Sequence, residues 1–138
     1  MNFTEVPNAD LFDKARWWVP YAVQIANHEG DDPQDYIWEA IRGEARIFVF
    51  WHDGKPTGAC ATRVLVNHDG SKTGELHWQA GEGMAEWLPE CLPQIEQILI
   101  RDHRVTRLRA TGRTGLERAL KPFGYRRVKI ILEKGAGE

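Results

Sequence analysis

The sequence has 138 residues, of which 42% are hydrophobic, so it is long enough to bury a core as one domain. Two cysteines are too few for a disulfide framework, and no apolar run approaches the roughly 20 residues of a membrane-spanning helix. The first residues do not combine a basic segment with a following apolar one, so we expect a protein of a reducing compartment without a secretory signal.

The net charge of −2 hides an uneven distribution along the chain. Residues 1–99 contain 16 acidic and 7 basic residues, a net charge of −9, whereas residues 100–138 contain 4 acidic and 11 basic residues, a net charge of +7. This asymmetry could serve an anionic ligand, nucleic acid, or the packing of copies through acidic and basic complementarity. The two halves could equally neutralise each other within one fold.

The N-terminal part predicts two helices. Asp10 is a suitable N-cap for a first helix that ends at Gly30, and Pro20 is expected to kink or split this helix. Asp32, followed by a proline, is the N-cap of a second helix that ends at Gly43.

The pattern then changes to that of β-structure, with β-branched and aromatic residues separated by glycine-containing turns. Three strands are predicted in the middle of the chain, at residues 45–52, 57–67 and 75–79, and residues 2–7 could add another short strand.

Helical spacing returns over residues 87–99, where Pro89 and Pro93 favour a clean helix only from Pro93 onward. The remaining elements are predicted as a strand at residues 105–110, a helix at 114–121, a strand at 125–133, and a tail at 134–138. This order of elements predicts a single α+β domain over residues 1–138, antiparallel at first and with a later crossover.

The order of elements, together with Gly124-Tyr125 after a short helix, resembles the GNAT superfamily of acyl-CoA-dependent N-acyltransferases. The resemblance implies a GNAT-like domain in which a mixed, mostly antiparallel sheet carries helices on both faces. Leu120 stands where the family often has a tyrosine that acts as general acid, and leucine cannot protonate a departing thiolate. Tyr125 is expected to pack in the core.

A glycine-containing loop after the third central strand is similar to the pyrophosphate-binding loop of that family. Its glycines are one place out of step, and Glu82 would place a carboxylate near the phosphates. The resemblance implies that acetyl-CoA is the cofactor if the protein is active, with Gln79, Gly81, Gly83 and Arg113 as its binding residues. The same loop could be an ordinary turn between a strand and a helix.

Glu75 and His77 are the candidate catalytic residues. They lie two positions apart on one predicted strand, so both side chains are expected on the same face. Either one could take a proton from an amine, directly or through a water molecule. The alternative is a solvated strand edge. The histidines and cysteines show no metal-ligand spacing, so no metal site is expected.

The run from Gly112 to Tyr125 is also similar to small bacteriophage proteins with the GNAT fold. That resemblance implies a virion structural or assembly component with weak or no catalysis, found in the host cytoplasm or the virion and bound to other virion proteins or to copies of itself. The alternative is an acetyl-CoA-dependent N-acyltransferase of unknown acceptor. A second alternative is a module that binds nucleic acid through its basic face.

Overall fold

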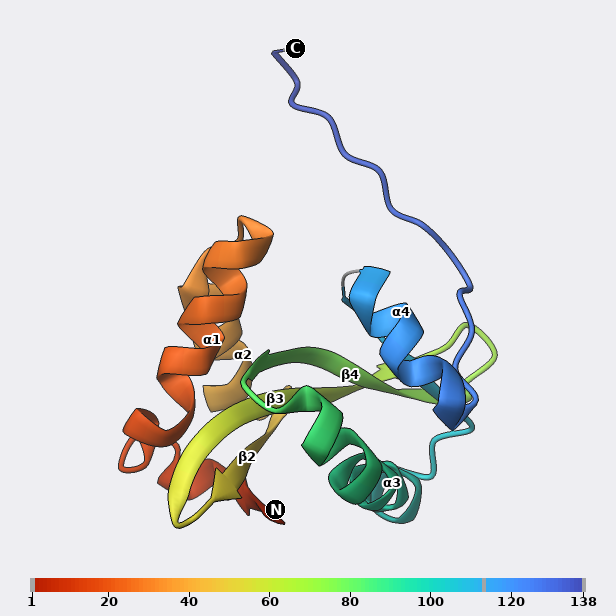
Figure 1. Cartoon of the computed structure of the whole chain (residues 1–138). Helices are drawn as coiled ribbons and strands as arrows, with labels where there is room; N and C mark the ends of the chain where they lie inside the picture. The colour runs from red at the N-terminus through yellow and green to blue at the C-terminus, as the bar shows by residue number, and fades with distance from the viewer. Residues whose placement is uncertain (1, 113, 138) are drawn as a thin grey trace.

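A five-stranded sheet in the order β1-β2-β3-β4-β5 lies at the centre of the computed structural model, which describes residues 2–112 and 114–137 (Figure 1). The first four strands pair antiparallel, and β5 pairs parallel to β4. The strands are β1 (Asn2–Val6), β2 (Arg46–His52), β3 (Lys55–Val66), β4 (Lys72–Gly81) and β5 (Arg107–Ala110). The predicted mixed, mostly antiparallel sheet is therefore confirmed.

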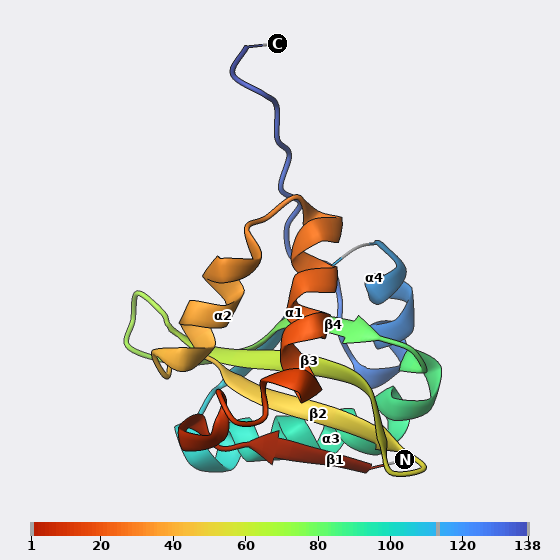
Figure 2. The same ribbon diagram turned by 90° about the vertical axis from the view of Figure 1, so that its left-hand side faces the viewer.

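Helices cover both faces of this sheet. One face carries α1 (Ala15–Glu29) and α2 (Pro33–Ile41), which lie in front of the strands in Figure 2. The other face carries α3 (Met84–His103) and α4 (Thr114–Leu120). Alternate residues of β2 pack into the two layers, because successive side chains of a strand point to opposite faces. Ile47 and Val49 contact the α1–α2 layer, and Phe48 and Phe50 contact the α3–α4 layer.

The two N-terminal helices follow their predicted signals to different extents. The Asp32 side chain accepts a hydrogen bond of 2.9 Å from Gln34 N, so the start of α2 is as predicted. Gly30 ends α1 in a left-handed conformation, also as predicted, and α1 runs through Pro20 without being split. The helix begins only at Ala15, because residues 8–10 form a separate 3-10 turn. None of the helices in the described residues is both long enough and apolar enough to cross a membrane.

The predicted start of α3 near Pro93 is wrong, because the helix begins at Met84 and continues through Pro89 and Pro93. Both prolines lie on its exposed side, where the cost of the missing backbone hydrogen bonds is not increased by burial. The opposite side is anchored in the core, and this packing outweighs the poor local propensity. Its buried residues are Trp87, Leu88, Cys91, Leu92, Ile95 and Leu99.

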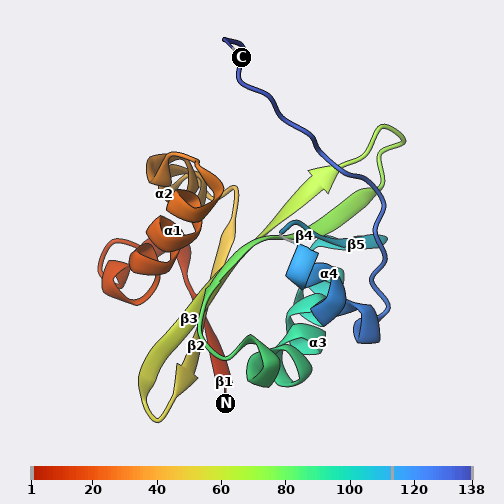
Figure 3. The same ribbon diagram turned by 45° about the horizontal axis from the view of Figure 1, so that its top comes forward.

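The predicted strand at residues 125–133 is absent. After α4, a 3-10 turn (Lys121–Phe123) and Gly124 lead into an extended segment that projects away from the body of the protein (Figures 1 and 3). The residue types favour a strand, but an isolated extended segment without a pairing partner is not one. The residue pattern does not determine whether a neighbouring strand is available for pairing, and this segment has none among the described residues.

Candidate active site at the fork between β4 and β5

A β-bulge interrupts the pairing of β3 with β4. Ala61 pairs with Trp78 and the next residue, Thr62, pairs with Leu76, so His77 is an extra residue on β4. The parallel pairing with β5 ends at the same point, where Leu76 faces Ala110. Beyond it β4 continues to Gly81, while the chain after β5 turns toward α4 (Figure 3). The bulge lies on the β3 side of β4 and redirects His77, and the end of the β4–β5 pairing at the same level leaves a fork between β4 and β5.

Four charged or titratable side chains form a closed ring on the α2 side of this fork. Arg63 on β3 contacts Glu75 Oε1 through Nε at 2.6 Å and Glu39 Oε2 through Nη1 at 3.3 Å. His77 lies between the same two carboxylates, with Nε2 at 3.0 Å from Glu39 Oε1 and Nδ1 at 3.5 Å from Glu75 Oε1. The sheet and α2 therefore bring together both predicted catalytic residues with two that sequence reasoning missed.

Glu75 is an ionised carboxylate in a buried position, with 3% of its surface exposed. Burial works against ionisation, but the close contacts with His77 and Arg63 outweigh it and lower the pKa of Glu75 to about 2. The Thr111 hydroxyl also donates a hydrogen bond of 3.2 Å to Glu75 Oε2. The pair of Glu75 and His77 is therefore packed inside the protein, and it is not part of a solvated strand edge.

The His77 side chain is 14% exposed, and its Nδ1 is buried and makes no hydrogen bond among the described residues. Nε2 faces Glu39 and Nδ1 faces Glu75, so each ring nitrogen of His77 lies beside a carboxylate.

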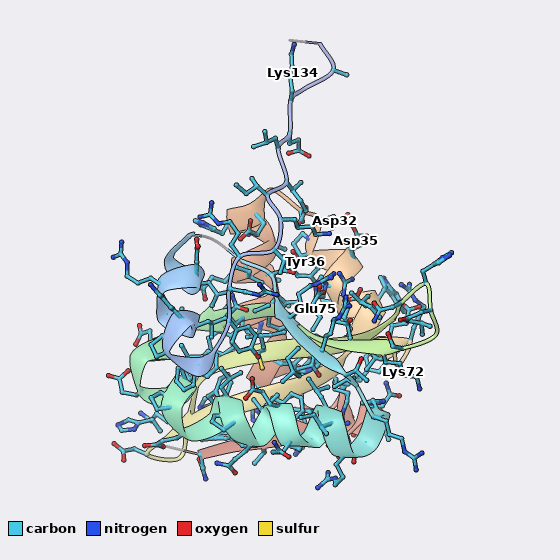
Figure 4. The ribbon with its side chains drawn as sticks, turned by 90° about the vertical axis from the view of Figure 1, so that its right-hand side faces the viewer. Asp32, Asp35, Tyr36, Lys72, Glu75 and Lys134 are labelled. Carbon is cyan, nitrogen blue, oxygen red and sulfur yellow. The ribbon has the colours of Figure 1, made fainter. Side chains whose placement is uncertain are left out.

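Tyr36 on α2 forms a further wall of this site (Figure 4). Its ring packs edge-on against His77, at 5.5 Å between ring centroids, and stacks on Trp78. The hydroxyl donates a hydrogen bond of 2.7 Å to Asp31 Oδ2. Burial, followed by the contact with Asp31, raises the pKa of Tyr36 well above 10, so the side chain is a neutral phenol.

The sequence did contain weak signals for the residues that were missed. Glu39 lies three residues after Tyr36 and next to buried Ala40, so α2 carries a carboxylate on its sheet-facing side. Arg63 is a charged residue inside the apolar strand β3. A charge at such a position needs a partner, and the partner is found here across two elements.

The glycine loop joins β4 to the N-terminus of α3. Gly83 is the N-cap of the helix in a left-handed conformation, with no side-chain cap, and Glu82 is exposed. Packing against β3 requires a glycine at position 81, because a Cβ there would lie 2.4 Å from Thr57 O. Gln79 is half-buried, and its Oε1 has no hydrogen-bond partner among the described residues. Arg113 lies outside them.

The position of the family's usual acid is part of the core. Leu120 is 2% exposed and packs between α3 and α4. Tyr125, five residues later, donates a hydrogen bond of 2.6 Å to Glu96 Oε2, and burial followed by this contact raises its pKa far above the ordinary value. Tyr125 therefore packs against the α3–α4 layer, as expected. Within the described chain, no group of three or more His, Cys, Asp or Glu is arranged to hold a metal.

Known proteins match this chain in structure. No protein-family model matches the chain, and no curated protein matches its sequence. A glucosamine-6-phosphate N-acetyltransferase from Arabidopsis thaliana has a TM-score of 0.66 at 11% identity, covering 98% of this chain and 97% of the other. An aminoglycoside 6'-N-acetyltransferase from Acinetobacter haemolyticus has a TM-score of 0.65 at 11% identity, with 98% and 97% coverage.

A predicted acetyltransferase from Clostridium acetobutylicum, whose structure includes acetyl-CoA, has a TM-score of 0.64 at 8% identity and covers 97% of this chain and 95% of the other. The three proteins share nearly the full length of this chain and the same arrangement of elements, whereas their sequences have diverged almost completely. This chain therefore has the fold of the GNAT acetyltransferases.

Proposed function

We propose that this protein is an acetyl-CoA-dependent N-acyltransferase in which His77 takes the proton of the acceptor amine. The observation that carries the proposal is the position of His77, which lies at the bulge, between Glu39 and Glu75, at the level where β4 and β5 part. The acetyltransferases with the same fold support this function over the virion component that the C-terminal resemblance implied. The nucleic-acid-binding hypothesis depends on charge alone.

The residues present fit an acyl-CoA. Past the bulge, β4 is no longer paired with β5, so its backbone at residues 77–81 can bond to amide groups of an extended ligand. The α3 N-terminus has no side-chain cap, and the first N–H groups of a 20-residue helix are suited to a pyrophosphate. Gln79 would supply one more polar contact. Glu82 is exposed and can turn toward solvent, which reduces the repulsion that its carboxylate would cause.

The acyl-CoA supplies an activated thioester when bound. His77 accepts a proton from the acceptor amine through a water molecule, because the imidazole Nδ1 is itself buried. Glu39 and Glu75 hold the imidazole in place, and Arg63 positions both carboxylates. Glu75 is a weak proton acceptor because its pKa is about 2, so we assign the transfer to His77. Leu120 cannot assist the departing thiolate, so catalysis relies on positioning of the two substrates.

Isothermal titration with acetyl-CoA and with desulfo-CoA tests the cofactor. We expect micromolar binding that Gly83→Asp abolishes, because the new carboxylate lies at the helix N-terminus. Gly70→Asp is the matched control, since Gly70 also has a positive φ and lies in the exposed β3–β4 turn. Absence of binding at millimolar ligand, or an equal loss in both variants, contradicts the proposal.

The same titrated protein is then assayed for release of the CoA thiol with a panel of amines. His77→Gln should lower kcat about 100-fold or more while the Kd for acetyl-CoA stays within about twofold. His68→Gln, in the exposed β3–β4 turn, is the control and should retain full activity. Full activity in His77→Gln would show that another group takes the proton.

A further inference from the structure

The outer edge of β5 is open. This strand is the last in the sheet and pairs with β4 on one side only, so its other backbone edge has no strand partner in residues 2–112 and 114–137. An open edge is a template for another extended segment. Nothing in the proposed catalytic function uses this edge.

The extended C-terminal segment, residues 126–133, is the complementary feature. Its sequence, Arg-Arg-Val-Lys-Ile-Ile-Leu-Glu, has the residue types of a strand. Four large apolar side chains are nevertheless 65–89% exposed, namely Val128, Ile130, Ile131 and Leu132. A contiguous exposed run of this kind is rare on a monomer and marks an interaction site.

The direction in which the segment leaves the protein is fixed at its base. Gly124 has a φ of +91°, and its N–H donates to Lys121 O. Tyr125 is held by the hydrogen bond from its hydroxyl to Glu96 on α3 and by one from its N–H to Leu120 O. Past this anchor the chain runs by β5 without pairing and points away from the body (Figures 1 and 3). The segment is therefore presented outward, to a second molecule.

We propose that two copies of this chain exchange these segments, so that residues 126–133 of each copy pair with the β5 edge of the other. Each copy has one unpaired segment and one open edge, so a reciprocal exchange satisfies both and closes the assembly. Eight extended residues span roughly 26 Å, which is ample for the four residues of β5.

The side-chain patterns of the two segments match. On β5, Ala110 packs into the α3–α4 layer, while Arg109 lies beside Glu75 on the α2 side of the sheet. In the segment, apolar Val128, Ile130 and Leu132 share one side, and the other side carries basic Arg127 and Lys129 followed by Ile131 and Glu133. Pairing therefore buries one apolar row against the α3–α4 layer.

The other row faces the acidic part of the molecule. Residues 1–99 carry a net charge of −9, and Asp31 and Asp32 before α2 and Asp35 in its first turn lie on the side of the sheet where Arg127 and Lys129 of a paired segment would lie. Charge complementarity between a basic segment and an acidic layer thus favours a second copy as the occupant.

Light scattering coupled to gel filtration, over a concentration series of the full chain, tests the exchange. We expect a mass of about twice 15.8 kDa for the wild type. Ile130→Lys combined with Leu132→Lys should raise the dimer dissociation constant by about tenfold or more, because two buried apolar side chains become charged. The control is Val66→Lys, which places the same charge on an equally exposed apolar residue at the end of β3.

A monomer at all concentrations, or a dimer that the double variant does not weaken, overturns the proposal. The second measurement uses a mixture of copies labelled with different isotopes and detects only contacts between copies by NMR. Contacts between residues 128–132 of one copy and β5 of the other support the exchange. A dimer without these contacts, or protection of the segment in a monomer through its own β5, overturns it.

Discussion

Glu75 is held as a carboxylate where almost no water reaches it, and this has a consequence for acid stability. Its pKa is lowered from an ordinary value of 4.5 to about 2, because Arg63 and His77 outweigh the effect of burial. A lowered pKa contributes stability that is fully present above pH 4.5 and is lost as the pH falls toward 2. The contribution is about 3 kcal/mol, from roughly 1.4 kcal/mol per pKa unit.

We therefore compare the wild type with Glu75→Gln by urea unfolding at several pH values and one protein concentration. The difference in the free energy of unfolding should fall by about 3 kcal/mol between pH 5 and pH 2. Glu133→Gln, in the exposed C-terminal segment, should differ little from the wild type throughout. A difference for Glu75→Gln that does not change with pH contradicts the assigned ion pairing.

The sequence named Glu75 and His77 as candidates because they lie two positions apart on one strand, and the structure places the two side chains side by side. Glu39 and Arg63 were missed because they become neighbours of His77 only when α2 packs on the sheet. The bulge also breaks the alternation of side chains along β4, because it places His77 and the following Trp78 on the same face, toward α1 and α2. A sequence pattern with a period of two residues does not predict this.

Among the elements, the two strands β3 and β4 approach closely at one glycine. A Cβ at Gly58 would lie 2.7 Å from Ala80 O, so Gly58→Ala forces the strands apart. We expect a loss of about 1–3 kcal/mol in the free energy of unfolding. Gly115 lies in α4, with nothing within 4 Å of a Cβ, so Gly115→Ala should stabilise by up to about 1 kcal/mol through helix propensity. Equal effects of the two substitutions on chemical unfolding would contradict this packing.

Element types were predictable where local chemistry decided them, as at the start of α2 and at the end of α1. They were not predictable where tertiary packing decided them. The start of α3 was expected near Pro93, but the buried side of the helix holds its first turns in place. The strand expected at residues 125–133 has the right residue types and lacks a partner within the same copy.

The whole molecule consists of two hydrophobic layers that share one sheet. Because β2 contributes alternate side chains to both layers, neither layer can lose its packing while the other remains intact. Native-state hydrogen exchange should therefore give opening free energies within about 1 kcal/mol for the amides of Ala22 in α1 and Ile95 in α3. A gap of several kcal/mol between the two would mean that the layers unfold separately.

The extra residue in β4 also governs how this chain can be compared with its distant structural neighbours. At 8–11% identity, an alignment has almost no letters to guide it, and one that shifts β4 by a single residue after His77 exchanges the two faces of the strand for every residue up to Gly81. Equivalent positions around the fork must therefore be matched by superposing backbones. A side chain that an alignment places one column before or after His77 can still occupy the same position as His77 in the superposed structures.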